Sequence, residues 1–349
     1  MKNWEKYIVQ QTLTIRQTLT IINDLGEINC VLFVTDNKGV LLGTVTDGDI
    51  RRGLIGNAQL EQPILLIANR KFKKLFNGNI DVNYIRKCKQ DGLNILPTVD
   101  EEGVIRNIIN LNEIKAILPL HAIIMAGGKG ERLLPLTKAT PKPMLKVGDK
   151  PIIEHNIDRL KAYGIQYFHI SVNYLGHIIS DYFKDGSDKG INIQYLTENK
   201  PMGTLGCLSM VKDFQKDDLL IMNSDLLTNI DFADFYNEFR QQEADMAVAT
   251  IPYHVDLPYA IMELDGAKVT AFKEKPRYTY FANAGIYLIK KSFIDLIPKD
   301  SFYNATDLMS LLIQKEKKLI NYPIIDYWLD IGKPEDFARA QKDILHLHF

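Results

Sequence analysis

Three glycines occupy four consecutive positions shortly after residue 120, at Gly127, Gly128 and Gly130. The apolar run before them, residues 122–126, is typical of a buried parallel strand. Without a Cβ, these glycines let the backbone bend tightly and bring its N–H groups close to a ligand. The cationic side chains that follow are Arg132, Lys138 and Lys142. Together these features predict a phosphate cradle; the alternative is a glycine-rich turn beside a solvated basic face.

Two better-known phosphate motifs do not fit this segment. A dinucleotide fingerprint beginning at Gly128 would need glycine where Leu133 stands. A Walker A loop would need glycine at Ile123, and serine or threonine where Gly130 follows Lys129. The cradle is therefore of another kind.

Two carboxylates further along the chain are candidates for a metal site. Asp225 closes the run Leu-Leu-Ile-Met-Asn-Ser-Asp, and Asp330 lies in Trp-Leu-Asp-Ile-Gly. A carboxylate at the end of a buried strand is costly without a partner. Mg²⁺ prefers oxygen ligands and usually takes one or two protein carboxylates beside substrate phosphates. We therefore predict that both aspartates hold Mg²⁺; alternatively, Asp225 caps the next loop and Asp330 pairs with Lys333.

Charged residues near these segments suit phosphoryl or nucleotidyl transfer, which depends on positioning and charge neutralisation more than on covalent chemistry. Arg132 and Lys142 carry the charge that a leaving pyrophosphate needs. Lys275 could hold the phosphate of a second substrate, and Glu274 its sugar hydroxyls. A surface charge pair at a strand end is an equally common explanation of Glu274 and Lys275.

The elements that must position these residues alternate between strand and helix. Expected strands lie at 122–126, 167–174, 191–196 and 219–225, and expected helices at 151–163, 176–183, 205–214 and 232–243. This alternation predicts a doubly wound, Rossmann-like α/β sheet, in which ligands collect at the carboxyl ends of the strands. The glycine segment, residues 198–203 and Asp225 all follow strand ends and should converge there.

From about Asp245 the pattern changes to hairpins. Expected strands lie at 246–253, 260–264, 268–274 and 282–289, and expected helices at 307–317 and 334–346. We interpret this part as an inserted substrate lobe with a closing helix.

The N-terminal third contains a weak internal repeat. Residues 30–52 follow the order strand, Asp-Asn-Lys-Gly turn, strand and helix start, and the stretch from Ile95 repeats that order. At a constant offset of 64 residues, Gly43, Thr46 and Asp49 fall opposite Asn107, Asn110 and Glu113. Two such units in tandem predict a pseudo-symmetric α+β pair over residues 1–118, followed by a second domain over 119–349. A short helical stretch is expected from Asn112, and with no Gly/Ser-rich linker after it, the two domains should pack closely.

Length and composition fit a two-domain globular protein of 349 residues with 46% hydrophobic and 24% charged residues. The net charge of −1 gives no attraction to nucleic acid or an acidic membrane. We find neither a secretory signal nor an apolar stretch of about 20 residues. The three cysteines, Cys30, Cys88 and Cys207, are widely spaced and should be buried thiols. We therefore expect a cytoplasmic homo-oligomer that binds neither nucleic acid nor membrane.

Residues 121–349 resemble the sugar-1-phosphate nucleotidyltransferase family. Ala-Gly-Gly-x-Gly-x-Arg-Leu-x-Pro-Leu-Thr and the following Pro-Lys-Pro-Met-Leu carry the resemblance most specifically. Pro-Met-Gly-Thr-Leu-Gly, Glu-Lys-Pro, Asn-Ala-Gly and Trp-Leu-Asp-Ile-Gly follow in the family's order. The resemblance implies a catalytic pair, Arg132 and Lys142, and a Mg²⁺ site at Asp225 and Asp330.

The same resemblance implies the substrate-binding residues. The nucleotide-binding set is Met125, Gly127, Gly128, Gly130, Glu198 and Gly203, and the sugar-phosphate set is Glu274, Lys275 and Asn283. The sequence departs from the family at Ser224 and Ala260, where glycine is usual, and at Glu131, where threonine is usual. These departures put the fit of the sugar in doubt, whereas the metal site is still expected to form.

Residues 1–118 resemble a pair of CBS domains. The first repeat has the family's Gly-x-x-Thr-x-x-Asp signature at Gly43, Thr46 and Asp49, which implies a site for an adenine nucleotide. A carboxylate can accept ribose hydroxyl protons, and a threonine near a helix N-terminus suits phosphate. The alternative is that Thr46 and Asp49 only cap a helix. The second repeat departs from the signature at Asn110 and Glu113.

One residue and one further resemblance narrow the choice of substrates. Guanine offers adjacent N1–H and N2–H donors that one carboxylate accepts together, and Glu198 is placed for that role, which favours GTP. Uracil or thymine would suit glutamine instead. The join of a CBS pair to such a domain is similar to the glucosamine-1-phosphate guanylyltransferases of legionaminic-acid-type pathways. That similarity implies GDP-glucosamine as product. Mannose 1-phosphate is an alternative substrate, and a nucleotide sensor with a non-catalytic transferase fold is an alternative function.

Overall fold

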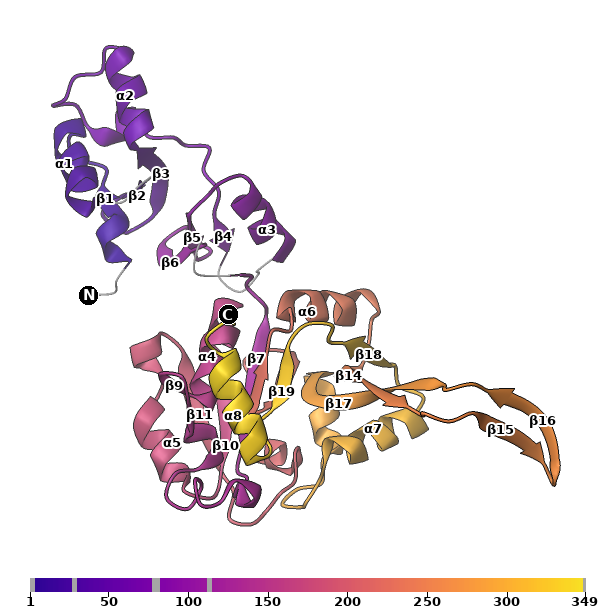
Figure 1. The fold of residues 1–349 in the computed structure, drawn as a ribbon. Coiled ribbons are helices and arrows are strands. Elements are labelled where there is room, and N and C mark those ends of the chain that lie inside the picture. Colours follow the sequence, from indigo (N-terminus) through magenta and orange to yellow (C-terminus); the bar gives the residue numbers. More distant parts are fainter. Residues whose placement is uncertain (1–3, 27–29, 77–81, 112–114, 348–349) are drawn as a thin grey trace. The chain divides into compact units, whose positions relative to one another are not determined.

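The computed structural model describes residues 4–26, 30–76, 82–111 and 115–347. The chain divides into two compact units, Met1–Ile117 and Leu118–Phe349, which we call unit 1 and unit 2 (Figure 1). None of the helices among the described residues is long and apolar enough to cross a membrane.

Unit 1 contains two three-stranded sheets of the same design. One has the order β1 (Ile8–Gln10), β2 (Val31–Thr35), β3 (Leu41–Thr46); the other has β4 (Leu75–Phe76), β5 (Ile95–Val99), β6 (Ile105–Asn110). In each sheet the first two strands are parallel and the last two antiparallel. The helices are α1 (Ile15–Leu25), α2 (Asp47–Ile55) and α3 (Val82–Gln90).

The two sheets repeat each other down to the register. Val31 pairs with Thr46 in the first, and Ile95 with Asn110 in the second, at the offset of 64 residues predicted from sequence. Both ladders carry a register shift at equivalent positions, after Val34 and after Thr98.

The repeats are joined by a pair of reciprocal hydrogen bonds. The N–H of Leu41 donates to the carbonyl of Gly103 (3.0 Å), and that of Ile105 to the carbonyl of Gly39 (3.1 Å). Exchanging the repeats exchanges these two bonds, so unit 1 has internal pseudo-two-fold symmetry. Glu113 lies outside the described residues, as does the start of the expected helix at Asn112, and residues 115–118 are not helical.

Unit 2 is built on a seven-stranded sheet of order β11-β10-β7-β12-β17-β14-β18. The strands are β7 (Leu120–Ala126), β10 (Tyr167–Val172), β11 (Asn192–Thr197), β12 (Asp218–Asn223), β14 (Met246–Asp256), β17 (Arg277–Lys290) and β18 (Leu319–Pro323). Its helices are α4 (Ile152–Ala162), α5 (Gly176–Phe183), α6 (Phe232–Gln241), α7 (Ala305–Gln314) and α8 (Pro334–Asp343). Short two-stranded sheets pair β8 (Lys146–Val147) with β9 (Lys150–Pro151), β13 (Leu226–Thr228) with β19 (Trp328–Asp330), and β15 (Ile261–Asp265) with β16 (Lys268–Lys273).

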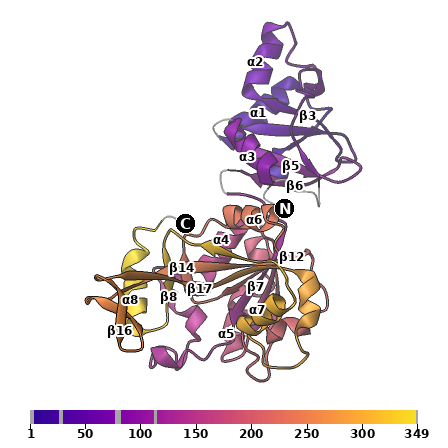
Figure 2. The same cartoon turned by 90° about the vertical axis from the view of Figure 1, so that its right-hand side faces the viewer.

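The first four strands of the large sheet have the topology expected of a nucleotide-binding fold. They are parallel, and in chain order they lie 3-2-1-4, so the strand order reverses at β7. Figure 2 shows β7 beside β12 in the sheet. Ligands bind at the carboxyl ends of strands at such a switch point. Here those ends carry the glycine segment, after β7, and Asp225, after β12.

The rest of the sheet corrects the sequence interpretation. β17 is antiparallel to β12, and β14 is antiparallel to β17, so the sheet is mixed rather than doubly wound throughout. The strands expected at 246–253 and 282–289 therefore complete the central sheet and do not form a separate lobe. Only the hairpin of β15 and β16 stands apart from it.

The helix expected at 205–214 is also wrong, because only a short 3-10 helix forms, at Gly206–Met210. A Cβ on Gly206 would lie 2.3 Å from the carbonyl oxygen of Ser301. Gly206 is therefore packed closely against Ser301, in the segment before α7. Leu205 and Leu208 join α7 in a core cluster on one face of the sheet.

A buried histidine pair lies at the opposite edge of the sheet from the glycine segment. The N–H of Gln215 donates to Nδ1 of His121 (3.2 Å), which leaves the proton of that ring on Nε2. Nε2 lies 2.7 Å from Nδ1 of His169, whose own Nε2 lies 3.1 Å from Oε1 of Gln194. When both imidazole rings are neutral, each N–H in this series of hydrogen bonds has an acceptor. Burial and the neighbouring His169 lower the pKa of His121 to about 3, and burial lowers the pKa of His169.

We predict that this pair makes the protein acid-labile. Below about pH 6.5, the ordinary pKa of histidine, these two histidines bind protons in the unfolded chain but not in the folded chain. The free energy of unfolding therefore falls as the pH decreases toward 3. The loss approaches about 1.4 kcal/mol per pH unit for each histidine, and denaturant unfolding between pH 8 and pH 5 would measure it. His169→Gln should reduce this slope, and His177→Gln, at an exposed histidine, should not. Equal slopes in wild type and His169→Gln would contradict the prediction.

Candidate functional site

The glycine segment is packed against the residues that follow it. Gly130 has a φ of +65°, and a Cβ there would lie 2.9 Å from Cβ of Lys142 and 3.0 Å from Cγ2 of Thr137. The Thr137 hydroxyl donates to the Gly130 carbonyl (2.9 Å). Glycine is therefore required at this position for both its conformation and its contacts, and the segment lies directly beside Lys142.

Lys142 lies between the two predicted metal ligands. Its ammonium donates to Oδ2 of Asp225, and Nζ is 3.8 Å from Oδ1 of Asp330. The aspartates are adjacent because β13 pairs with β19, with Leu226 opposite Asp330, and because the N–H of Ile331 donates to the Asp225 carbonyl (3.1 Å). The carboxylates thus share Lys142, and Lys333 is not the observed partner of Asp330.

The surroundings of Asp330 disfavour its charged form. Burial and the nearby charge of Asp225 raise the pKa of Asp330, although Lys142 and Arg132 oppose the shift. Arg132 lies beside it: a Cβ on Gly332 would be 3.5 Å from both guanidinium nitrogens of Arg132 and from Oδ2 of Asp330. Gly332 thus lies within contact distance of both side chains.

The donor set fits Mg²⁺. Two carboxylates facing one cation match the one or two that Mg²⁺ usually takes from a protein, with phosphates and water completing its octahedron. Among the residues that the structure describes, no group of three or more His, Cys, Asp or Glu side chains could hold a metal. Asp225 and Asp330 would therefore hold the ion together with substrate phosphates, rather than in a closed protein cage.

Glu198 lies at the other end of the glycine segment. Its carboxylate accepts hydrogen bonds from the Ser171 hydroxyl and from the N–H of Met202 (3.2 Å). A Cβ on Gly127 would lie 3.3 Å from its Oε1. Glu198 is only 8% exposed, so a buried charge with two donors faces the glycine segment.

Two sulfur-containing residues line the strand behind Glu198. The sulfurs of Met125 and Cys207 are 3.9 Å apart. Burial, with the charge of Glu198, raises the pKa of the Cys207 thiol to about 12, so it stays neutral. Cys30, Cys88 and Cys207 are all buried free thiols, as expected from sequence.

Gly203 is fixed by packing. It has a φ of +71°, and a Cβ would lie 2.7 Å from the carbonyl oxygen of Tyr303 and 2.8 Å from Oδ1 of Asn304. The fold therefore requires glycine here whatever the segment binds. Gly203 follows Met202, whose N–H bonds Glu198, so it belongs to the same end of the site.

The predicted sugar-phosphate residues are divided between two places. Asn283 lies near the end of β12: its Oδ1 accepts from Gly285 N–H (2.9 Å), and a Cβ on Gly285 would lie 2.6 Å from Nδ2 of Asn223, two residues before Asp225. Glu274 and Lys275 are exposed, between β16 and β17. Among the described residues, neither side chain forms a hydrogen bond or ion pair with the glycine segment or with the aspartates.

In unit 1, Thr46 and Asp49 form a helix cap. The Thr46 hydroxyl accepts from Asp49 N–H (3.2 Å), and the Asp49 carboxylate accepts from Thr46 N–H (2.9 Å) at the start of α2. Arg52 adds an ion pair to Asp49. The capping alternative is therefore present, and any nucleotide would have to compete with these contacts.

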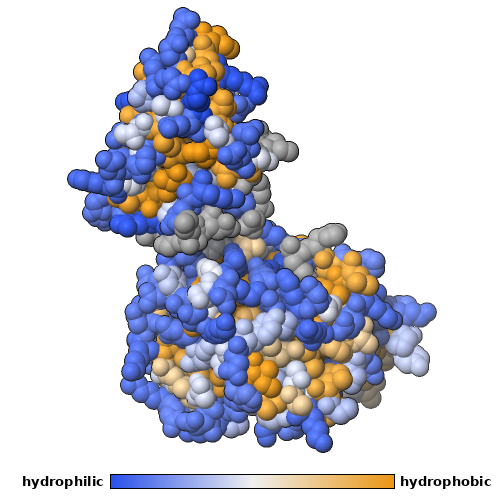
Figure 3. Space-filling model, turned by 90° about the vertical axis from the view of Figure 1, so that its left-hand side faces the viewer, coloured by the Kyte–Doolittle hydropathy of each residue, from blue (hydrophilic) through white to orange (hydrophobic). Residues whose placement is uncertain are grey.

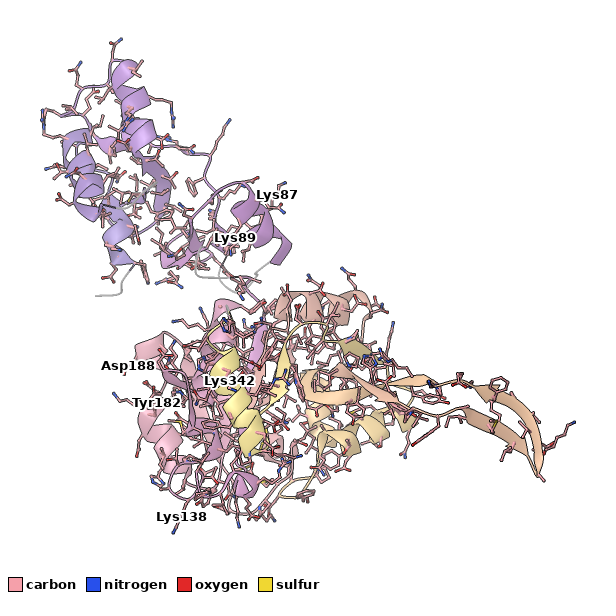
Figure 4. The ribbon with its side chains drawn as sticks, in the orientation of Figure 1. Lys87, Lys89, Lys138, Tyr182, Asp188 and Lys342 are labelled. Atoms are coloured by element: carbon pink, nitrogen blue, oxygen red, sulfur yellow. The ribbon has the colours of Figure 1, made fainter. Side chains whose placement is uncertain are left out.

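Sequence reasoning missed three polar residues that support the site. Ser171 bonds Glu198, the Asn173 amide donates to the Glu198 carbonyl (2.9 Å), and the Asn156 amide donates to the Ser224 carbonyl (3.2 Å). Ser171 and Asn173 sit at the carboxyl end of β10, a position that could have identified them. Lys138, by contrast, is exposed and points outward at the edge of unit 2 (Figure 4).

Comparisons with known proteins agree with this arrangement. Residues 121–346 match the family model described as "Nucleotidyl transferase". A mannose-1-phosphate guanylyltransferase of Mycobacterium tuberculosis is 32% identical over 232 residues, covering 65% of each chain. The bifunctional protein GlmU of Methanocaldococcus jannaschii is 31% identical over 233 residues, which are 65% of this chain and 54% of the relative. The chain thus spans about two thirds or less of the length of these curated relatives.

A solved structure supports the same fold. HddC from Yersinia pseudotuberculosis superposes with a TM-score of 0.51 and 24% identity, covering 64% of this chain and 99% of its own. The family match spans all of the segments that contain the glycine loop, Lys142 and the paired aspartates. Unit 2 thus identifies this chain as a member of the nucleotidyl transferase family.

Proposed function

We propose that the chain transfers a nucleotidyl group from a nucleoside triphosphate to a sugar 1-phosphate, releasing pyrophosphate. The observation that carries the proposal is the position of Lys142, whose ammonium lies between Asp225 and Asp330 and whose Cβ packs against Gly130. Backbone N–H groups, a buried cation and two carboxylates at one strand edge suit the phosphates of a nucleotide. Relatives named as guanylyltransferases support it.

In this reaction a phosphate oxygen of the sugar 1-phosphate attacks the α-phosphorus in line. The bond from the α-phosphorus to the bridging oxygen breaks, and that oxygen leaves with its electron pair on pyrophosphate. Arg132 and Lys142 stabilise the negative charge that develops there. The glycine segment positions the triphosphate, and Glu274, Lys275 and Asn283 hold the sugar phosphate.

Mg²⁺, held by Asp225 and Asp330, would neutralise charge on the phosphates when bound. Its role here is supported by the donor set and by the charge of the site. The protein residues supply the remaining positioning.

We propose guanine as the base. The Glu198 carboxylate is buried and receives two donors, although its two oxygens can accept about four hydrogen bonds. Guanine N1–H and N2–H would fill the remaining positions. A buried carboxylate rejects bases that offer acceptors there, because its charge would stay unpaired.

We predict that Glu198 determines the preference for GTP over ITP, which lacks the N2 amino group. In the wild type, kcat/KM should be about 10- to 100-fold higher for GTP than for ITP, the value of one hydrogen bond to a charged group. In Glu198→Gln the ratio should fall close to one. Glu154→Gln is the matched control, because Glu154 is a buried carboxylate that instead contacts Lys189 and Tyr182. An unchanged ratio in Glu198→Gln would exclude Glu198 as the base-reading residue.

For the sugar, we propose glucosamine 1-phosphate, because a CBS-like unit and a nucleotidyltransferase unit occur in one chain. We also propose that the product is a nucleotide sugar for a nonulosonic-acid or surface-glycan pathway. Mannose 1-phosphate is the second candidate, favoured by the named activity of the M. tuberculosis relative. Four nucleoside triphosphates assayed against glucosamine, mannose and glucose 1-phosphates, with pyrophosphate as readout, would decide between them. Absence of pyrophosphate release in every combination would favour a non-catalytic sensor.

For unit 1, we propose the CBS-type function of binding an adenine nucleotide at Thr46 and Asp49, with an effect on unit 2. The internal symmetry of unit 1 supports a paired-domain design, and the cap at α2 provides a helix N-terminus. Calorimetry with AMP and ATP on the full chain and on Asp49→Ala would test this. Equal heats for both proteins would leave unit 1 with a structural role.

A further inference from the structure

The hairpin of β15 and β16 extends from the central sheet as a ribbon without cover (Figure 1). We call residues 257–276 the arm. Every residue from 262 to 275 is exposed, so the rest of unit 2 buries none of them. An isolated two-stranded hairpin is only marginally stable in water. The arm therefore lacks the hydrophobic contacts that a stable ribbon needs.

The arm nevertheless has the pattern of a ribbon with one covered face. Met262 lies opposite Phe272, and Leu264 lies opposite Val269. Side chains two apart on a strand, such as Met262 and Leu264, share a face. The four thus form one apolar surface, which we call the arm face.

A register shift preserves the arm face. Val269 and Phe272 are three residues apart, which in a regular strand would place them on opposite sides. The ladder shifts between Glu263 and Leu264, and the extra residue on β16 returns both side chains to one face. The other side carries the ion pair of Lys273 with Glu263 (2.8 Å). A bulge that keeps four apolar side chains on one face is expected where that face packs against another protein surface.

The exposed area is close to what one partner contributes to a stable interface. Phe272 is 66% exposed, Leu264 62%, and Val269 and Met262 more than half, and near the base of the arm Tyr259 and Tyr280 are 76% and 59% exposed. Since a fully buried aromatic side chain removes about 150–250 Å², these six offer on the order of 700 Å² of apolar surface. A standard interface takes about 800 Å² from each partner.

The charges of the arm are compatible with a second copy of the same chain. The arm carries three acidic and three basic side chains, Glu263, Asp265, Glu274, Lys268, Lys273 and Lys275. A balanced surface does not attract nucleic acid or an anionic membrane, and it presents no net repulsion to its own copy. A self-complementary patch related by a two-fold axis is the commonest way for one protein to cover such a face.

Unit 1 also exposes apolar side chains on one face (Figure 3). Among the described residues of unit 1, the most exposed large apolar side chains are Ile55 and Leu66. Those elements pack on buried core clusters of their own. Unit 1 is therefore not short of internal contacts, whereas the arm is.

We propose that the arm face is a dimer interface, where it packs against the arm of a second copy of this chain. Glu274 and Lys275 lie at the base of the arm, so dimerisation would order the residues proposed above to hold the sugar phosphate. The dimer itself needs no substrate, and measuring it does not depend on the proposed function.

Sedimentation velocity of the full chain over about a hundredfold range of concentration tests the interface. We expect twice the 39.8 kDa mass for the wild type. In Phe272→Glu the dimer dissociation constant should rise by about a hundredfold or more, because the new charge would be buried. Lys268→Glu, on the same ribbon but outside the arm face, is the matched control and should remain dimeric.

The outcomes separate clearly. A wild type that stays monomeric at every concentration would overturn the proposal, and so would a Phe272→Glu protein as dimeric as the wild type, since the dimer would then use another surface. Circular dichroism checks that the variants fold. If Phe272→Glu fails to fold, Met262→Glu, at the residue paired with Phe272, gives the same test.

Discussion

Replacing Asp225 with asparagine is expected to lower turnover about 1000-fold while the protein stays folded. The change removes one of two carboxylates that face a common cation, and an asparagine is a weak Mg²⁺ ligand. Loss of one preorganised charge at a transferring phosphoryl group typically costs about 10²–10³ in rate, close to 3–4 kcal/mol. Pyrophosphate release at saturating GTP and sugar 1-phosphate would measure this effect.

The control for this change is Asp245→Asn. Asp245 forms a comparable pair with Lys290 (2.8 Å), and Lys290 lies at the end of β17 opposite Asp218, on the far edge of the sheet from the site. That variant should lose some stability and retain turnover within about twofold. If Asp225→Asn keeps wild-type turnover, the aspartates do not hold the catalytic metal. If Asp245→Asn loses as much, the effect is one of general stability.

Replacing Lys142 with methionine is expected to have two effects of opposite sign. Turnover should fall about 10²–10³-fold, because the positive charge that stabilises the leaving pyrophosphate is lost. Without nucleotide, however, the variant should bind Mg²⁺ about tenfold more tightly than the wild type. The Lys142 ammonium contacts Asp225 and lies 3.8 Å from Asp330, so it would compete with a metal for the same carboxylates.

Calorimetric titration of Mg²⁺ into the nucleotide-free proteins measures the second effect, with Lys290→Met as the matched control. Weaker Mg²⁺ binding by Lys142→Met would show that the lysine supports the metal site instead of competing with it. A purely structural role for Lys142 would lower turnover without tightening metal binding. The two readouts therefore distinguish a counter-ion from a packing residue.

The parts of the site that follow strand ends could be predicted from sequence. The glycine segment after β7 and Asp225 after β12 lie at one edge, because parallel strands share their carboxyl ends. The pairing of Lys142 with Asp225 could not be predicted, since 83 residues separate them. The position of Asp330 could not be predicted either, because it depends on how β13 meets β19. Ser171 was missed, although it lies one residue before the end of β10, at the same edge of the sheet.

The errors in the fold have a physical cause. The strands at 246–253 and 282–289 have the alternation of a hairpin, and that local pattern is the same whether the pair stands alone or joins a larger sheet. Pairing of Leu219 with Ile289 decides the matter, and it is a contact between distant segments. In the same way, where a helix is expected at 205–214, Gly206 packs against the carbonyl of Ser301, and no local periodicity records this close approach between distant segments.

The short ladder between β13 and β19 has a consequence for biosynthesis. The chain emerges from the ribosome N-terminus first, and domains fold as their residues become available. Leu226 can meet Asp330 only after nearly all of unit 2 has been made, and α8 follows β19 directly. A nascent or C-terminally truncated chain would have a glycine loop and Asp225 but no second carboxylate. Bringing this second carboxylate beside Lys142 is therefore among the last steps in the folding of unit 2.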